Sequence, residues 1–253
     1  MLGAVLTVFI TLLAILLLSR WVSKLMVGLM GGFAFNIFML PGVLVHELSH
    51  LIGAICTLTP VRGFSVIPEN TGDGEWVLGK VTHDATDNPL KQIIISTMPF
   101  FGGAVAVWLS AGFLLKEFQM SAPAISLTAS GIEHYIWGWF AFANIFFHSI
   151  DLSLWQSWVF LYLTITICAH LAPSNHDLLY ALGGVVEMIF IVAVIALALS
   201  TIGVVVKDYI APLIMRATGT MLSILTYILA VLILIALVAG ILSGLKRLLT
   251  NRT

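Results

Sequence analysis

The chain has 253 residues, of which 60% are hydrophobic and only 9% are charged. Soluble domains carry about 25% charged residues, so this composition predicts a polytopic membrane protein. The apolar segments described below predict an all-α fold with about six transmembrane helices. The net charge of −1 gives no basis for nucleic-acid binding. Cys56 and Cys168 both lie in apolar segments, which disfavours a disulfide framework.

The first predicted helix covers residues 2–19 and has no small-residue cleavage site, so we expect it to be retained. Arg20 and Lys24 are expected to mark a short turn. Residues 25–57 form a second apolar stretch, which is too long for one straight span of about 20 residues. Pro41 should kink this stretch or locally open it.

An HExxH sequence, His46-Glu47-Leu48-Ser49-His50, lies inside the second apolar stretch. On a helix, His46 and His50 are one turn apart and share a face. Two imidazoles at this spacing can bind one zinc ion, with Glu47 beside the metal as a general base. Ionisable residues at membrane depth are costly and mark functional sites. The alternative interpretation is a solvated cluster at a helix end.

Residues 58–89 are rich in Gly, Pro, Asp and Asn. Two strand-like runs, 61–67 and 75–81, flank a turn around residues 70–74. This pattern predicts a small β-hairpin insertion after the HExxH helix, near the membrane surface. An ordinary polar loop is the alternative.

The remaining chain predicts further helices. One span is opened by Asn88-Pro89, and a short aromatic segment and three apolar stretches follow it. In chain order these segments are residues 90–115, 134–150, 154–172, about 177–206 and about 213–245.

This order divides the chain into three parts. Residues 1–24 form an N-terminal transmembrane helix, and residues 207–253 form a C-terminal transmembrane helix with a basic tail. Between them, residues 25–206 form a membrane core that contains the 58–89 hairpin and the 134–150 segment.

The HExxH sequence supplies two metal ligands, whereas a catalytic zinc ion normally takes three from the protein. Asp177 is the favoured third ligand, because it follows Pro173 and opens a helix, whose N-terminus favours a carboxylate. The same position also suits a plain helix cap. The other candidates are His148, Asp151, His170 and His176.

Together, HELSH in a membrane helix, a hairpin loop, a Pro-containing span with small residues (MPFFGGAVA) and a distant Asp at a helix start resemble the site-2 protease family of intramembrane zinc metalloproteases. The resemblance covers roughly residues 25–190. It implies that His46, His50 and Asp177 bind Zn²⁺ and that Glu47 activates water.

The chain departs from the family pattern at the third ligand. The family places Gly after the ligating Asp and an Asn and prolines before it, whereas Leu178 follows Asp177 here. The stretch from Asn144 to Asp151 is a competing partial match that lacks the proline and the glycine. Asp151 and His148 are therefore kept as alternative third ligands.

The resemblance implies a zinc-dependent intramembrane endopeptidase that cleaves transmembrane or membrane-proximal segments of protein substrates. It further implies a multi-pass protein in the lipid bilayer of a prokaryotic plasma membrane. The alternative is a catalytically inactive, metalloprotease-like protein that binds helices or serves as a subunit of an oligomer or a larger membrane complex. Metal transport is disfavoured, because Glu187 is the only charge within residues 178–206.

Which residue can be the third ligand depends on whether residues 134–150 cross the membrane. Asp177 reaches the zinc face only if one crossing separates it from the 90–115 span, and the 154–172 span supplies that crossing. Residues 134–150 are therefore predicted to be re-entrant or interfacial. If they cross, His148 or Asp151 reaches the zinc face instead.

In the family that the chain resembles, the zinc end of the HExxH helix lies nearer the cytosol, which with six spans implies that both termini are cytosolic. The basic residues Lys246 and Arg247 agree with this orientation by the positive-inside rule, whereas Arg20 and Lys24 disagree with it.

Overall fold

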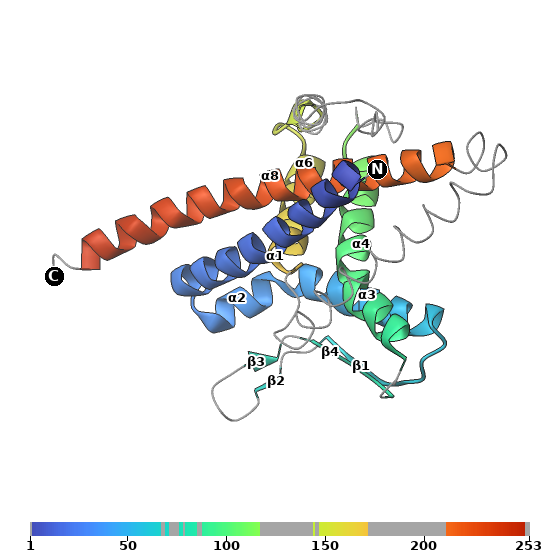
Figure 1. The fold of residues 1–253 in the computed structure, drawn as a ribbon. Helices are drawn as coiled ribbons and strands as arrows, with labels where there is room; N and C mark the ends of the chain where they lie inside the picture. The colour runs from blue at the N-terminus through green and yellow to red at the C-terminus, as the bar shows by residue number, and fades with distance from the viewer. Residues whose placement is uncertain are drawn as a thin grey trace.

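The computed structural model describes residues 2–66, 69–70, 76–77, 79–84, 88–116, 144, 147–171 and 211–250. Most of these residues are helical, and two short strand pairs lie on one side of the helices (Figure 1). The helices are α1 (Leu2–Met30), α2 (Gly32–Phe38), α3 (Leu40–Cys56), α4 (Pro89–Leu114), α6 (Trp155–Ala169) and α8 (Ala211–Thr250).

Three of the described helices are long and apolar enough to cross a membrane: α1 over Ile10–Met30, α4 over Leu90–Leu114 and α8 over Ser223–Leu249. The pair α2 and α3, bent by 64°, would make a fourth span. The described residues therefore confirm a helical membrane protein but not six spans. The helix expected at 177–206 and most of the 134–150 segment lie outside the described residues.

The expected turn at Arg20 and Lys24 is wrong. Helix α1 continues through both residues to Met30, because Arg and Lys are good helix formers. The break comes at Gly31, whose φ of 81° is a left-handed conformation that glycine adopts without strain. The N-terminal helix is therefore longer than the expected 1–24.

The helical segment is also interrupted just before Pro41, as the sequence predicts. Helix α2 ends at Phe38, and Pro41 lies in the first turn of α3, where its missing N–H leaves no helical hydrogen bond unmade. The Tyr162 hydroxyl of α6 donates to the Phe38 carbonyl at 3.0 Å. Pro41 thus begins a new helix rather than kinking a continuous one.

Small residues let α3 and α4 pack closely and antiparallel. A Cβ built at Gly53 would lie 2.8 Å from Met98 Cγ, and one built at Gly102 would overlap the Ser49 hydroxyl. The Asn88 side chain caps α4 by accepting from the N–H groups of the next two helical residues. Residues 95–102 of α4 therefore lie beside the middle of α3, which carries the HExxH sequence.

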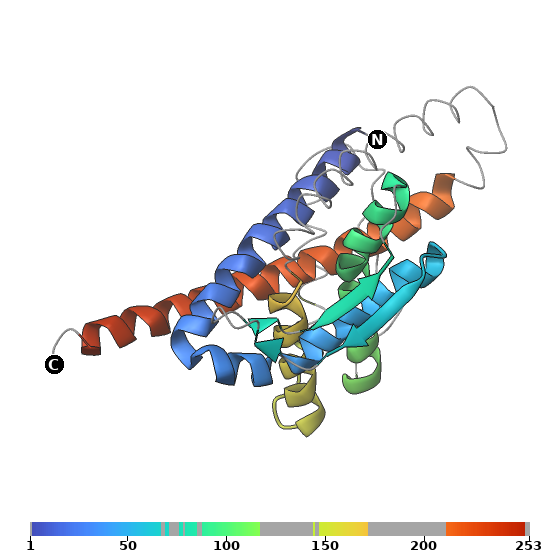
Figure 2. The ribbon, with the colours of Figure 1, turned by 90° about the horizontal axis from the view of Figure 1, so that it is seen from below.

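The predicted hairpin is confirmed. Strand β1 (Val61–Ser65) pairs antiparallel with β4 (Lys80–His83), and β2 (Glu69–Asn70) pairs antiparallel with β3 (Trp76–Val77). The run expected as one strand over 75–81 is divided between β3 and β4. Viewed from below, β1 and β4 lie directly over α3 (Figure 2).

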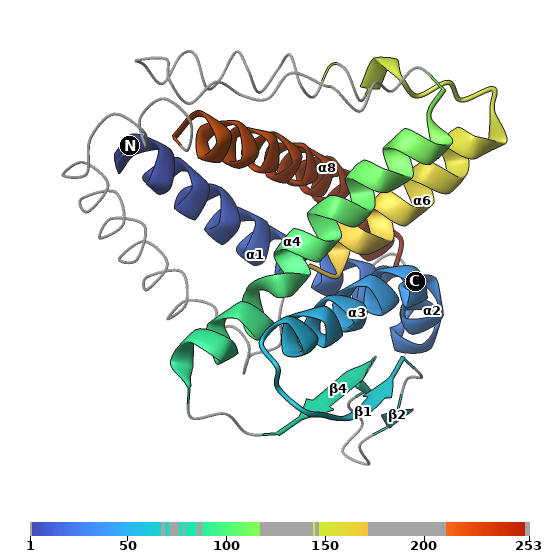
Figure 3. The same cartoon turned by 90° about the vertical axis from the view of Figure 1, so that its right-hand side faces the viewer.

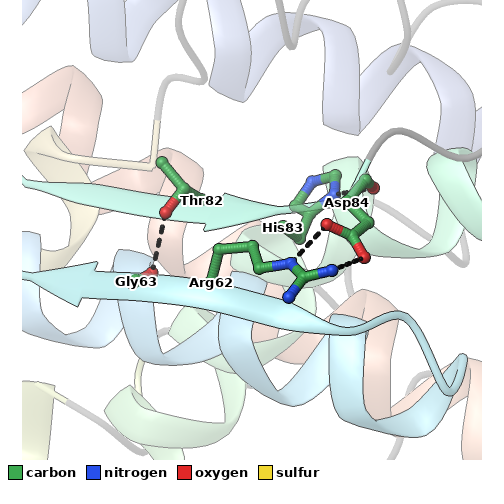
Figure 4. A network of polar contacts seen from close by, with 5 residues as sticks. All are labelled: Arg62, Gly63, Thr82, His83 and Asp84. Atoms are coloured by element: carbon green, nitrogen blue, oxygen red, sulfur yellow. Dashed lines mark hydrogen bonds and ion pairs between the residues drawn. The ribbon is translucent and has the colours of Figure 1, made fainter.

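A two-pronged ion pair joins the two strands of the hairpin near its base (Figure 4). Arg62 Nε and one terminal guanidinium nitrogen donate to the two Asp84 carboxylate oxygens at 2.6 and 2.7 Å. These hydrogen bonds hold the pKa of the Asp84 carboxyl below its ordinary value. Because both groups are exposed, the pair fixes the register of the strands more than it stabilises them.

Helices α1 and α8 run in the same direction along each other (Figures 1 and 2). The Lys246 ammonium of α8 donates to the Gly28 carbonyl near the end of α1 at 2.8 Å. If both helices span the membrane, the start of α1 and the end of α8 lie on opposite faces. The expected six spans would instead place both termini on one face, so the described helices do not confirm that expectation.

Candidate functional site

The HExxH side chains lie inside the protein. His46 and Glu47 are each 7% exposed and His50 is 9% exposed. Helix α3 holds them between the hairpin on one side and α4 and the C-terminal end of α6 on the other (Figure 3). This burial excludes the interpretation of the motif as a solvated cluster at a helix end.

The two histidines face each other as a metal-binding pair would. His46 Nε2 and His50 Nε2 are 3.1 Å apart. Two nitrogens bound to one tetrahedral zinc ion at about 2.0–2.1 Å are about 3.3 Å apart. The present separation is therefore close to what the ion needs, and the donor set of the pair fits zinc.

The second nitrogen of His50 is also engaged. His50 Nδ1 is 2.8 Å from the Ile95 carbonyl of α4. A backbone carbonyl in this position fixes the tautomer and the ring plane of a metal-binding imidazole. His46 differs, because its Nδ1 is buried and has no hydrogen-bond partner among the described residues.

Glu47 lies beneath the hairpin. A Cβ built at Gly79, one residue before β4, would lie 2.6 Å from Glu47 Cγ and 2.8 Å from Val43 Cγ1. Only a residue without a side chain allows this approach. The backbone of the hairpin at Gly79 therefore comes close to the side chain of Glu47, which the motif assigns as base.

The favoured third ligand, Asp177, and its neighbour His176 lie outside the described residues. Within the part of the chain that the structure describes, no three His, Cys, Asp or Glu side chains are arranged to hold a metal ion. The pair formed by His46 and His50 is thus the part of the expected zinc site that the described residues contain.

Asp151 and His148 are not brought to this pair. They precede α6, whereas the opposite end of α6 is the one that meets α3, about 22 Å further along a 15-residue helix. The Asp151 carboxylate accepts from the Ser153 N–H and hydroxyl at 2.9 and 2.7 Å. These hydrogen bonds, together with the charge of Lys116, lower the pKa of the Asp151 carboxyl. Its environment is that of a turn at a helix start.

The proximity of Lys116 to Asp151 also bears on topology. It shows that the chain leaves α4 and enters α6 at the same end of the bundle. A segment that begins and ends on one face does not need to cross, which agrees with the prediction for 134–150. That segment itself stays a prediction, since most of it is not described.

The structure does bring one of the lower-ranked candidates to the motif. The rings of His170 and His46 are 5.2 Å apart between centroids, in an edge-to-face arrangement. The sequence signal for this contact is Gly42, which lies one helical turn before His46 on the same face. A glycine there lets another helix end come close to the histidine.

The contact between Gly79 and Glu47 leads to a prediction. Gly79→Ala should displace the Glu47 side chain, because the new methyl group would overlap Glu47 Cγ. If the motif hydrolyses peptides with a bound zinc ion, as the HExxH sequence predicts, we expect hydrolysis to fall by up to about 10²-fold, the cost of a 1 Å misplacement, while the zinc content is unchanged. A cleavage assay and metal analysis of the purified variant measure both effects.

Gly63→Ala is the matched control, because its Cβ would meet Thr82 Oγ1 at 2.8 Å within the hairpin itself. Equal loss of activity in both variants would mean that the hairpin is generally sensitive and that its contact with Glu47 is not the cause.

Comparison of the chain with models of protein families, with curated proteins and with solved structures finds no match. Its activity is therefore inferred from the chemistry of α3 and of the elements that surround it.

Proposed function

We propose that this chain is a zinc-dependent intramembrane endopeptidase, similar to the site-2 protease family, which cleaves transmembrane or membrane-proximal segments of proteins. The observation that carries the proposal is the buried pair His46 Nε2 and His50 Nε2, 3.1 Å apart, with Glu47 on the same helix. We place the enzyme as a multi-pass protein in the plasma membrane of a prokaryote.

His46 and His50 would hold the metal, and Asp177 would complete the ligand set. When bound, zinc supplies Lewis acidity, which lowers the pKa of a water molecule towards about 7 and polarises the scissile carbonyl. The His50 ring is held ready for this role by the Ile95 carbonyl. Burial of the pair supports the proposal further, since electrostatic interactions are stronger where water is excluded.

Glu47 would act as the proton carrier. Its carboxylate accepts a proton from the attacking water and returns it to the leaving amine, so that no charged amide leaving group forms. The Glu47 side chain lies 7% exposed beneath the hairpin, in a site from which bulk water is largely kept. A base in this position serves a reaction that needs one water molecule rather than many.

The hairpin supplies a way to bind an extended substrate. A helical peptide has its carbonyl groups in its own hydrogen bonds, so it must unwind before attack. A strand edge can take up such a peptide by main-chain hydrogen bonds. Because the residue just before β4 contacts Glu47, a peptide bound along the hairpin would reach the base.

The test uses the purified full chain in lipid vesicles with a model transmembrane peptide. We expect cleavage by the parent, loss of cleavage after removal of metal with a chelator, and recovery when Zn²⁺ is added back. A parent that retains zinc and cleaves no membrane peptide would favour the inactive, helix-binding alternative.

The same assay addresses the third ligand. We expect Asp177→Ala to lose both metal and cleavage, and Asp151→Ala to keep both, because Asp151 lies at the far end of α6. Full metal content in the Asp177 variant would remove that residue from the ligand set.

A further inference from the structure

The C-terminal end of α6 is held against α3 by a contact between backbones. A Cβ built at Gly42 would overlap the carbonyl oxygen of Thr166 and would lie 3.1 Å from His170 Cβ. Because the obstruction is a backbone atom, it cannot move aside as a side chain would. Gly42 therefore sets how closely the end of α6 approaches the face that carries His46.

Helix α1 fixes the same end of α6 from the other side. The hydroxyl groups of Ser19 and Ser23 both donate to the Ala169 carbonyl, at 3.0 and 2.9 Å. In addition, a Cβ built at Gly103 of α4 would overlap the Leu171 side chain. Three helices thus meet around residues 169–171, and the position of His170 between them is strongly determined.

The rings at this junction form a short row. The His46 ring is 4.8 Å from the His50 ring and 5.2 Å from the His170 ring between centroids, with interplanar angles of 75° and 77°. The His50 ring is oriented by the hydrogen bond between its Nδ1 and the Ile95 carbonyl. His46 Nδ1 has no such partner among the described residues, so the plane of the His46 ring depends on its contact with His50 and on the packing of the His170 ring against it.

We propose that His170 is a positioning residue of this site, whose ring packs edge-to-face on His46 and holds His46 Nε2 towards His50. The proposal rests on the proposed function, in which these two nitrogens bind the metal. A ring held in its binding orientation loses less rotational freedom when the metal arrives. In this proposal His170 orients the His46 ring, as the Ile95 carbonyl orients the His50 ring.

The test distinguishes the contribution of the aromatic ring of His170 from that of its two ring nitrogens. His170→Ala removes both, whereas His170→Phe keeps an aromatic ring and removes the nitrogens. We expect His170→Ala to weaken Zn²⁺ affinity by about 10–100-fold, the usual effect of losing a group that orients a ligand, and His170→Phe to restore most of it. Competition with a chromophoric chelator measures the affinity.

His148→Ala is the matched control, since it removes an exposed histidine at the opposite end of α6. Parental affinity in His170→Ala would overturn the proposal. So would an affinity in His170→Phe as weak as in His170→Ala, because the nitrogens rather than the ring would then matter.

A metal-free measurement keeps the two proposals distinguishable. In the ¹⁵N imidazole spectrum of the metal-free protein, His46 should show one set of signals in the parent and in His170→Phe, and mixed or broadened signals in His170→Ala. Unchanged His46 signals in His170→Ala would refute the positioning role. A parent that binds no zinc but shows this pattern would refute the proposed function alone.

Discussion

Replacing Glu47 with glutamine is expected to lower the rate of peptide hydrolysis by about 10²–10⁴-fold, the contribution of a general base. Glutamine has nearly the same shape but cannot accept the proton from water. Because Glu47 is buried under the hairpin next to Val43, a residue of the same shape should preserve the packing. The fold and the zinc content should therefore match those of the parent.

Initial rates of cleavage of a membrane peptide, measured with zinc content on the same samples, check this expectation. Glu47→Asp is a useful second variant, because it keeps a carboxylate base but shortens the side chain. Its cleavage rate should lie between the rates of the parent and of Glu47→Gln. Undiminished cleavage by Glu47→Gln would remove Glu47 from the base role. Loss of zinc in that variant would instead make Glu47 a part of the metal site.

Gly42→Ala is expected to destabilise the protein by about 1–3 kcal/mol, the usual cost of overpacking. The added methyl group would overlap the Thr166 carbonyl, so α3 and α6 must move apart. Alanine otherwise favours a helix over glycine by about 1 kcal/mol, which makes a loss of stability the more informative result. Separation of the helices should also withdraw His170 from His46 and weaken zinc binding.

Gly28→Ala is the control, because it places the same methyl group on a membrane helix with no atom within 4 Å. Thermal unfolding in detergent and zinc titration of both variants make the comparison. Gly28→Ala should be neutral or slightly stabilising. If the two variants unfold alike, the close approach of α6 to Gly42 is not part of what holds the site.

Local chemistry explains which parts of this molecule could be predicted from its sequence. The pairing of His46 with His50 follows from helical spacing, and the hairpin follows from strand-like runs around a polar turn. The two histidines are one turn apart, and the paired strands β1 and β4 belong to one short stretch of the chain, residues 61–83. The break before Pro41 is equally local, because proline at that position suits the first turn of a helix.

The features that the sequence did not predict correctly or at all depend on something else. In a hydropathy profile, Arg20 and Lys24 look like a loop between two apolar segments. Charged residues do not by themselves end a helix, however, and α1 ends only at Gly31, which has a left-handed conformation. The parallel course of α1 and α8 follows from packing between segments that are more than 200 residues apart. No spacing rule reports such a contact.

The contact of His170 with His46 shows the same limit. Helical periodicity places both residues within apolar segments but cannot tell which helix ends meet. The approach depends on the absent side chain of Gly42 and on two serines of α1 that hold the end of α6. The single clue in the sequence is Gly42, one helical turn before His46, and it indicates a close approach without identifying the residue that approaches.

Zinc analysis of the purified chain tests the central claim most directly. Elemental analysis of the parent should find one zinc ion per chain, and His46→Ala and His50→Ala should each lose it while the helical content stays unchanged. An Asp151→Ala sample prepared in parallel should keep its metal. A well-folded parent that contains no zinc, and takes up none when Zn²⁺ is supplied, would contradict the account.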